Sequence, residues 1–473
     1  MTSSRGNVDL ARHLALAFEA EVGRLALSDG SRIGVIGGGP AGSFFSYFLL
    51  KMAESIGLNV AVDIYEPRLF DHVGPAGCNH CGGIVSESLV QLLAAEGINL
   101  PSTVVQRGID SYMLHMDVGD VRIDTPLHEK RIAAVFRGNG PRESRPIDAT
   151  GFDRYLLETA SSVGAKVVRK LVSNVRKEED GRPRLVSPDG SSAVYDLVAV
   201  ASGVNSHALH LFGKTAPDYV CPRSLRTFIG EFHLGREVIE KCLGTSMHVF
   251  LLDLPRLEFA AIIPKGDFAT LCILGEGVDE QLVQSFLSAP EVKRCFPGSV
   301  VPLPACHCFP RVNVVTAVRP FADRMVWVGD SGTARLYKDG IGSAYRTAKA
   351  AAKTAVFQGI SAEDFRKSFW PTCSKINFDN SIATVIFAAT HLIQKGRFLR
   401  RGVLRMTANE QSQEGTRRHM SSALWDVFTG SAPYKEVLLR SFHPGFPLML
   451  LWNLVVGNLP FKKARRMARE SRE

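Results

Sequence analysis

Three glycines in a short turn have the spacing needed to hold the phosphates of a dinucleotide. The turn runs Gly37-Gly-Gly39-Pro-Ala41-Gly42 and follows the apolar run at residues 32–36. Gly37 allows the tight turn, Gly39 lets the backbone approach a pyrophosphate, and Gly42 lets the following helix pack closely on a sheet. The N-terminus of that helix favours negative charge, because its free N–H groups and its dipole point at the phosphates. The sequence therefore predicts a dinucleotide site that includes Ala41 of the same turn.

A carboxylate completes this predicted site. Glu66 ends a second apolar run, residues 61–65, and lies 24 residues beyond Gly42. A carboxylate at this distance accepts hydrogen bonds from ribose hydroxyls in dinucleotide-binding folds. The segments together predict a strand, a phosphate-binding turn, a helix over about residues 40–55, and a second strand that ends at Glu66.

Two later segments have the character of further strands in the same sheet. Residues 195–202 form an apolar run that ends at Gly203, and residues 325–330 end in Gly-Asp, with Asp330 as the acid. An alanine-rich helical pattern follows over residues 341–356. We therefore expect the chain to return to the nucleotide domain late in the sequence.

In their order and spacing, the glycine turn with Glu66, the strand ending at Gly203, and the Gly-Asp segment resemble the flavoprotein superfamily of aromatic hydroxylases and geranylgeranyl reductases. The resemblance covers about residues 31–356 and implies that FAD is the bound dinucleotide. It implies that Asp330 binds a ribityl or ribose hydroxyl. It also places a helix N-terminus at Gly340, Ile341 and Gly342, near the pyrimidine carbonyls of the flavin. One departure is Tyr337, which stands where the family often has proline.

A second element, Cys81-Gly82-Gly83, looks like the cysteine-glycine-glycine element of the geranylgeranyl reductases. The resemblance places this loop beside the isoalloxazine ring. A cysteine there could protonate a carbon after hydride delivery, gate the flavin, or simply pack as a buried thiol. We take Cys81 as the candidate catalytic residue.

A third reductase element is a strand rich in aromatics that ends in proline and a lysine-glycine turn. Its counterpart is residues 259–266, where Pro264 and the Lys265-Gly266 turn are present. However, Ala261 and Ile263 stand where bulky aromatics would be expected. The strand either lines an apolar pocket or belongs to the core of a sheet.

The resemblance and the patterns together predict an α/β protein with a Rossmann-like FAD-binding domain, an inserted β-rich substrate domain and a helical C-terminal region. The expected parts are an N-terminal helical extension at 1–30, a discontinuous FAD-binding domain at 31–220 with 320–360, the β-rich substrate domain at 221–319, and the helical region at 361–473.

The remaining cysteines and histidines suggest several interpretations. Cys78 and Cys81, or Cys306 and Cys308, could bind a metal, form a thiol pair near the flavin, or be structural. Neither cluster has a complete zinc or iron–sulfur spacing, so no metal site is predicted. The histidines, including His307, are interpreted as surface or core residues.

The composition places the chain among ordinary globular proteins. It has 473 residues, 45% of them hydrophobic, and a net charge of +9. The cysteine usage and the polar first residues favour a reducing, cytoplasmic location. Basic clusters at 395–405 and 462–469 adjoin apolar segments. The apolar stretch 446–459 is too short to span a bilayer, because a spanning helix needs about 20 residues. We expect peripheral contact with a membrane and no nucleic-acid partner.

These features lead to three functional hypotheses. The first is an FAD-dependent oxidoreductase that reduces carbon–carbon double bonds of an apolar, isoprenoid or lipid-like substrate. The second is a flavin-dependent monooxygenase (hydroxylase) on the same fold, and the third is a membrane-associated binding protein with a structural flavin. Because no second glycine-rich fingerprint is evident, we expect electrons from transiently docked NAD(P)H or another electron donor.

Overall fold

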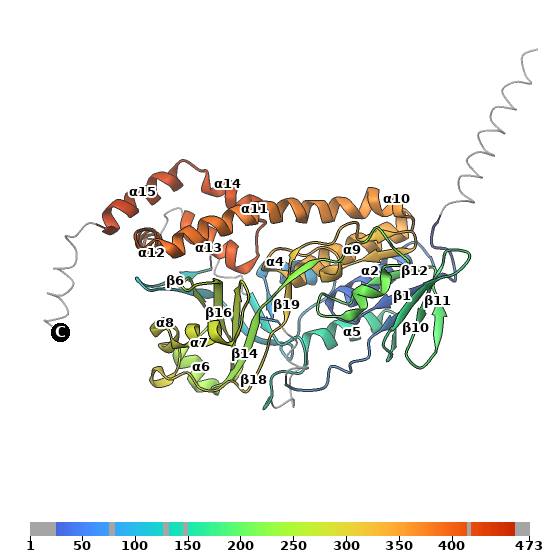
Figure 1. Ribbon diagram of the computed structural model, residues 1–473, viewed down its shortest axis with the longest axis horizontal. Helices are drawn as coiled ribbons and strands as arrows, with labels where there is room; N and C mark the ends of the chain where they lie inside the picture. Colours follow the sequence, from blue (N-terminus) through green and yellow to red (C-terminus); the bar gives the residue numbers. More distant parts are fainter. Residues whose placement is uncertain (1–24, 75–80, 126–131, 145–149, 414–417, 459–473) are drawn as a thin grey trace, which may run out of the picture.

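A mostly parallel sheet carries the glycine turn at the carboxyl end of its central strand. The computed structural model describes residues 25–74, 81–125, 132–144, 150–413 and 418–458 (Figure 1). The strand order of this sheet is β20-β21-β12-β1-β2-β8, and every pairing except β20 with β21 is parallel. The strands are β1 (Arg32–Ile36), β2 (Ala61–Tyr65), β8 (Lys166–Val168), β12 (Leu197–Val200), β20 (Phe321–Ala322) and β21 (Met325–Trp327). The predicted Rossmann-like α/β domain is confirmed.

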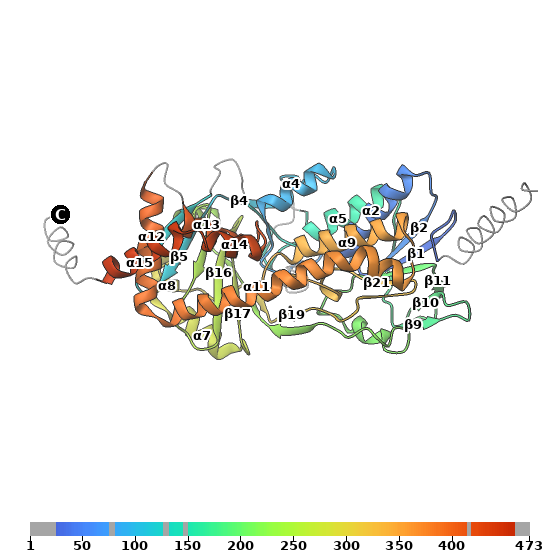
Figure 2. The same cartoon turned by 90° about the horizontal axis from the view of Figure 1, so that it is seen from above.

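Three helices cover one face of this sheet: α2 (Pro40–Ser55), α5 (Phe152–Ser162) and α9 (Gly340–Phe357) (Figure 2). Helix α9 packs along α2, and its buried face is rich in alanine, which allows the two helix axes to approach closely. Apolar side chains of a three-stranded meander pack on the opposite face of the sheet. The meander consists of β9 (Asn174–Lys177), β10 (Pro183–Val186) and β11 (Ser192–Val194).

A second, seven-stranded sheet forms the other half of the molecule, in the order β18-β14-β17-β16-β15-β5-β6. Its strands are β5 (Ser111–Met116), β6 (Gly119–Asp124), β14 (Phe228–His233), β15 (Ser246–Phe250), β16 (Leu257–Lys265), β17 (Phe268–Gly275) and β18 (Cys306–Cys308). The interval predicted as the substrate domain supplies β14 to β18, whereas β5 and β6 come from an earlier part of the chain.

Both faces of this second sheet are covered, so neighbouring residues along its strands enter different cores. Ile262 packs in the core that contains α7 (Glu280–Ser288), on the same side as α6 (Arg236–Cys242) and α8 (Pro290–Lys293). Ile263 packs on the opposite side, with residues of the C-terminal helices.

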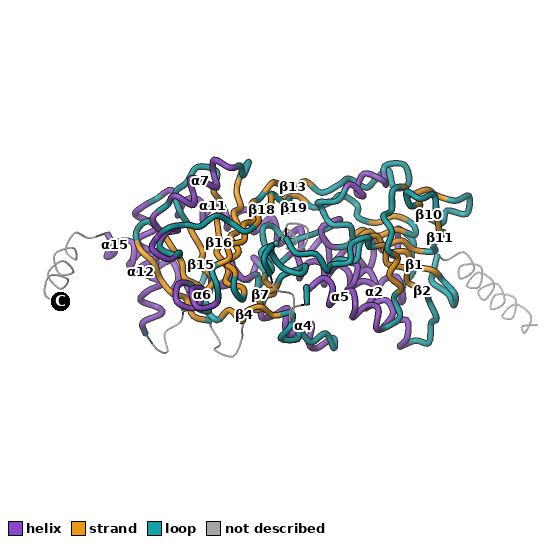
Figure 3. Tube along the Cα trace, turned by 90° about the horizontal axis from the view of Figure 1, so that it is seen from below, coloured by secondary structure: helices purple, strands orange, loops and turns teal. Residues whose placement is uncertain are grey.

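Two small sheets lie between the two halves (Figure 3). The first contains β3 (Ile84–Val85), β7 (Ile132–Val135) and β4 (Val105–Ile109), and α4 (Glu87–Ala95) follows β3 directly. The second pairs β13 (Arg223–Arg226) with β19 (Arg311–Val315).

The C-terminal region is helical, as predicted. Helix α11 (Trp370–Lys395) runs along both halves of the molecule, and four shorter helices then cover the second sheet (Figures 1 and 2). These are α12 (Arg397–Ser412), α13 (His419–Thr429), α14 (Tyr434–Ser441) and α15 (Gly445–Asn458). Within the described residues, no helix has both the length and the apolar character required to cross a bilayer. Most of the predicted extension at 1–30, and the basic cluster at 462–469, lie outside the described residues.

Candidate functional site

Two of the three turn glycines are required by contacts within the protein. A Cβ atom on Gly37, whose φ is +104°, would lie 2.6 Å from the carbonyl oxygen of Ala201. A Cβ atom on Gly42 would lie 1.9 Å from the carbonyl oxygen of Gly37. Any side chain at either position would therefore push the start of α2 away from the sheet.

The third glycine, Gly39, makes no close contact within the protein and lies beside an ion pair. A Cβ atom there would have Arg137 Nη2 at 3.5 Å and Asp153 Oδ2 at 3.9 Å as its nearest neighbours. Arg137 donates to Asp153 from Nε (2.9 Å) and from Nη2 (2.7 Å), and the carboxylate is fully buried. Burial lowers the pKa of Arg137, but the charge and hydrogen bonds of Asp153 outweigh it, so the net pKa is raised. The turn therefore has a permanent cation beside the opening at Gly39.

Glu66 lies next to the turn, as predicted, and it already has partners in the protein. Gly38 N–H donates to Glu66 Oε2 at 3.0 Å, and Arg68 Nε donates to Oε1 at 2.9 Å. The Arg68 guanidinium also lies over the Phe70 ring, 4.8 Å from its centroid. A ribose hydroxyl would have to share this carboxylate with Arg68 or displace it.

The Gly-Asp segment after β21 packs directly on the first turn of α2. A Cβ atom on Gly329, whose φ is +62°, would lie 2.7 Å from the Cβ atom of Ala41. The N–H of Gly329 donates to Thr347 Oγ1 of α9 at 2.9 Å, which fixes the turn from the other side. Two segments that are far apart in the sequence thus meet at the carboxyl ends of β1 and β21.

This packing places the Asp330 carboxylate near the start of α9, at the same end of the sheet as the glycine turn. Its Oδ1 atom lies 3.9 Å from the position of a Cβ atom on Gly340. Burial raises the pKa of Asp330, and the nearby charge of Arg137 opposes that rise. Among the described residues, no group donates a hydrogen bond to the half-buried Asp330 carboxylate, so its oxygens can accept a hydrogen bond from a ligand hydroxyl.

Gly203 marks the open edge of the same region at the end of β12. Its φ is +70°, and no atom of the described residues lies within 4 Å of the position that a Cβ atom would take. Its N–H donates to Ser331 Oγ at 2.9 Å, so the residue after Asp330 holds the end of β12 in place.

The N-terminus of α9 differs from the expected family pattern. Tyr337 and Asp339 have φ values of +61° and +54°, which a proline cannot adopt because its ring holds φ near −65°. The Asp339 carboxylate covers the helix end, since its Oδ1 would lie 2.1 Å from a Cβ atom on Gly342. Arg335 and Arg346 balance this charge, with Nη1–Oδ2 distances of 3.0 and 2.7 Å. Ile341 is buried, and the flavin contacts of residues 340–342 stay a prediction.

The Cys81-Gly82-Gly83 loop lies directly against the second sheet. A Cβ atom on Gly82 would lie 3.0 Å from Cys272 Sγ, and one on Gly83 would lie 2.9 Å from Lys265 Nζ. The N–H of Gly83 is 3.3 Å from Cys81 Sγ and donates to it. The loop thus joins the nucleotide domain to strands β16 and β17.

Behind this loop lies a buried polar group that sequence reasoning missed. Thr270 Oγ1 donates to Glu231 Oε2 at 2.7 Å, while Glu231 Oε1 has no hydrogen-bond partner within the described part of the chain. Burial raises the pKa of Glu231 to about 7, despite the opposing effect of the Lys265 charge. Lys265 is itself buried, with its ammonium 5.0 Å from the centre of the Phe136 ring. Cys272 and Lys265 lie against the Cys81 loop, and Glu231 bonds Thr270, two residues before Cys272 on β17, so these groups belong to one neighbourhood.

The cysteine pairs of the sequence do not join into one metal site in the described structure. Cys306 and Cys308 lie on β18 and pair in register with Glu231 and Ile229 of β14. Cys78 lies outside the described residues, so a Cys78–Cys81 thiol pair stays a prediction.

No protein-family model and no curated protein sequence matches this chain. Solved structures match it over most of its length. A geranylgeranyl bacteriochlorophyll reductase-like protein from Thermoplasma acidophilum is 15% identical, with 88% of this chain and 99% of that chain covered and a TM-score of 0.61. A variant of halogenase PltM in complex with FAD is 12% identical, with 93% of each chain covered and a TM-score of 0.57. The p-nitrophenol 4-monooxygenase PnpA from Pseudomonas putida is 13% identical, with 86% of this chain and 99% of that chain covered and a TM-score of 0.56. At such low identity these matches show a common fold.

Proposed function

We propose that this protein is an FAD-dependent oxidoreductase that reduces carbon–carbon double bonds of an apolar, isoprenoid or lipid-like substrate. The observation that carries the proposal is the convergence of Gly39, Arg137 and Asp330 at the carboxyl ends of the parallel strands. There, a backbone opening beside a permanent cation suits a pyrophosphate, and a carboxylate that accepts no hydrogen bond from the described residues suits a polyol. The fold shared with an FAD-bound halogenase variant supports the same cofactor.

Each residue would have a distinct part in this reaction. Arg137 would neutralise phosphate charge, and Asp330 would accept hydrogen bonds from ribityl or ribose hydroxyls. When bound and reduced by NAD(P)H or another donor, FAD would supply a hydride to one alkene carbon. The other carbon then needs a proton, which Cys81 or the Glu231 group behind it would hold.

Glu231 suits the proton-donating role because its pKa of about 7 keeps a large fraction of the carboxyl protonated near neutral pH. Donation leaves a carboxylate, which the nearby Lys265 charge stabilises. Solvent then returns the proton, so each cycle consumes one hydride equivalent from the donor and one proton.

The surroundings of this cluster favour an apolar substrate. The position of a Cβ atom on Gly82 lies 3.3 Å from Ile263 Cδ1. Ile263 and Ala261 belong to the buried apolar core between β16 and the C-terminal helices. The apolar surroundings lead us to place the substrate next to Ile263 and the Cys81 loop.

A monooxygenase is the second candidate, because the p-nitrophenol 4-monooxygenase shares the fold with a TM-score of 0.56, against 0.61 for the reductase-like protein. The two reactions leave different marks on the product. Incubation with an isoprenoid alkene and deuterated NAD(P)H under strict anaerobiosis would yield a saturated, deuterium-labelled product from a reductase. Oxygen-dependent product labelled by ¹⁸O₂ would instead support the monooxygenase. A flavin that no donor reduces would support the binding-protein hypothesis.

We also propose that helix α15 rests on an anionic membrane surface. Leu448, Leu451, Trp452 and Val455 recur at helical spacing and have exposed fractions of 68%, 60%, 66% and 50%. Helix α12 packs along α15 and carries the exposed basic residues Arg397 and Arg401. Arg400 does not join them, because its guanidinium is buried in an ion pair with Asp117.

A further inference from the structure

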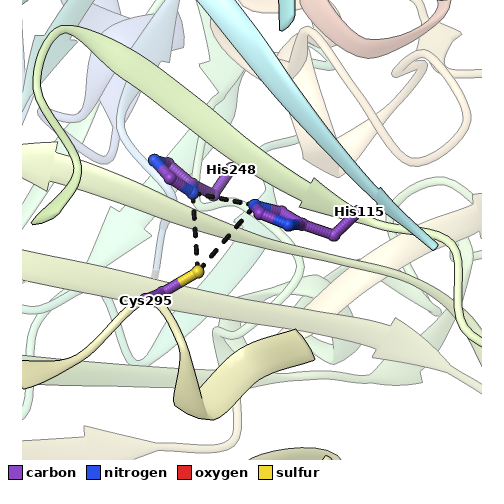
Figure 4. Close-up of side chains that lie close together, drawn as sticks. All are labelled: His115, His248 and Cys295. Carbon is purple, nitrogen blue, oxygen red and sulfur yellow. Dashed lines mark hydrogen bonds between the residues drawn. The ribbon is translucent and has the colours of Figure 1, made fainter. Parts of the chain in front are cut away.

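Three buried side chains from distant parts of the chain converge on the second sheet. His115 lies on β5, His248 on β15, and Cys295 just after α8 (Figure 4). His115 Nε2 lies 2.9 Å from His248 Nδ1, and Cys295 Sγ lies 3.8 Å and 3.5 Å from these two nitrogens. The three ligand atoms lie within 4.8 Å of one another, the single grouping of this kind within the described residues.

This cluster is separate from the proposed flavin site. His248 pairs in register with Ile262, whose side chain packs toward α7, whereas Ile263 points to the Cys81 side of the same sheet. The sheet therefore stands between the His115–His248–Cys295 cluster and the Cys81 loop.

The hydrogen bonds of the outer ring nitrogens show which nitrogen of each histidine carries the hydrogen. His115 Nδ1 lies 2.8 Å from Asp120 Oδ1, and His248 Nε2 lies 3.3 Å from the carbonyl oxygen of Leu243. A carboxylate and a carbonyl only accept hydrogen bonds, so each outer ring nitrogen carries its hydrogen. In neutral imidazoles the two inner nitrogens then face each other with lone pairs at 2.9 Å. The single Cys295 S–H can donate to just one of these nitrogens or to the carbonyl oxygen of Glu291 at 3.7 Å. Two lone pairs this close repel each other unless a cation, either a shared proton or a metal ion, lies among the three atoms.

We propose that His115, His248 and Cys295 bind a Zn²⁺ ion. Zinc bonds of about 2.0–2.1 Å to nitrogen and about 2.3 Å to sulfur give, in a tetrahedral site, separations of about 3.3 Å between nitrogens and about 3.6 Å between nitrogen and sulfur. The sulfur–nitrogen separations of 3.5 and 3.8 Å lie close to the second value, and the nitrogen–nitrogen separation of 2.9 Å would have to widen by about 0.4 Å to reach the first. Imidazole nitrogen with thiolate sulfur is a ligand set that suits zinc.

The surroundings orient the ligands as zinc sites require. Asp120 and the Leu243 carbonyl hold the ring N–H groups that point away from the ion, as the outer partners of zinc-bound histidines do. With three protein ligands, the fourth position would be open to a water molecule. The ion would tie β5, β15 and the segment after α8 to one another.

The test measures metal in the full-length protein purified without chelator. We expect about one zinc per chain by inductively coupled plasma mass spectrometry. After chelation, added Co²⁺ should produce the charge-transfer absorption band typical of a cobalt–thiolate bond. Added Zn²⁺ should then displace the cobalt and remove this band. Zinc well below one equivalent in the wild type, together with no cobalt–thiolate band on titration, would overturn the proposal in favour of a hydrogen-bonded network that shares a proton.

Two variants assign the ligands. Cys295→Ser should lose the cobalt–thiolate band, and His248→Gln should lower the metal content at least tenfold. Cys373→Ser is the matched control, because Cys373 is a free, buried cysteine on α11, outside this cluster. Should the ligand variants fail to fold, the wild-type stoichiometry and its zinc-dependent rise in melting temperature still decide the question. A wild type that binds cobalt through sulfur while Cys295→Ser keeps the same band would place the metal elsewhere and refute this assignment.

Discussion

The Arg137 guanidinium lies 3.5 Å from the position that a Cβ atom on Gly39 would take, with the buried Asp153 carboxylate on its other side. This relationship explains how a turn without side chains obtains a fixed positive charge. Asp153 holds the guanidinium through two hydrogen bonds, so the charge is in place before any phosphate arrives. The opening at Gly39 and the cation beside it are thus one feature built from two distant segments.

The first prediction follows from that opening. Gly39→Val would place a branched side chain in the space beside Arg137 and should remove most of the FAD from the purified protein. Flavin absorbance per folded chain measures the effect. Gly213→Ala is the control, because its Cβ atom would meet nothing within 4 Å in the described part of the chain and its φ is ordinary. A folded Gly39→Val protein with full flavin content would exclude the phosphate role.

The second prediction concerns the Asp330 carboxylate. If it accepts a hydrogen bond from a flavin hydroxyl, Asp330→Ala should cost about 1.5–3 kcal/mol, a tenfold to hundredfold loss of FAD affinity. Isothermal titration of the apoprotein measures this loss. Unchanged affinity would show that Asp330 lies away from the ribityl and ribose groups.

Sequence reasoning found the nucleotide domain because its signals are local. Gly39 and Pro40 set the start of α2, and the predicted range of about 40–55 matches the observed helix Pro40–Ser55. It did not find Arg137 or Glu231, because both depend on contacts between segments far apart in the chain. Alternating apolar residues identify strands but do not say which sheet they join. Consequently β5 and β6 were expected in the nucleotide domain, and the approach of His115 to His248 was not foreseen.

The third prediction uses the raised pKa of Glu231. If this carboxyl donates the substrate proton, the reduction rate should fall as pH rises through about 7, where the carboxyl loses its proton. Glu231→Gln should lower the rate and abolish this pH dependence while FAD stays bound. Glu240→Gln, an exposed acid on α6, serves as the control. An unchanged pH profile in Glu231→Gln would assign the proton to another group.

The same pKa has a consequence for stability. The folded state binds the Glu231 proton more tightly than the unfolded chain, whose pKa for Glu is about 4.3, so stability should fall as pH rises from about 4.3 to 7. Over that window the loss attributable to this group is on the order of 3 kcal/mol. Urea unfolding at several pH values, with wild type and Glu231→Gln compared, measures it. Parallel pH dependences of the two proteins would contradict the burial argument.

The fourth prediction separates the roles of Cys81. Cys81→Ser keeps the shape of the loop and should leave FAD bound, because no predicted cofactor contact depends on the thiol. If the thiol acts beside the flavin, the rate of substrate reduction or the product distribution should change. Cys308→Ser, on β18, tests whether any thiol loss has this effect. Equal turnover with the same products would leave Cys81 as a packing residue.

The last prediction concerns the exposed apolar stripe of α15. Leu451 and Trp452 lie at its centre, and burying them in a lipid interface would remove a large apolar area from water. Replacing both with Glu should abolish flotation with vesicles that contain phosphatidylserine. The change removes the apolar side chains that would insert and adds negative charge, which the anionic headgroups repel. Leu303→Glu, which alters a 92% exposed leucine near the second sheet, should float like the wild type. Binding of the wild type should weaken as salt rises, because the neighbouring arginines contribute about 1 kcal/mol each near an anionic surface. Equal flotation of all three proteins would show that α15 does not contact the membrane.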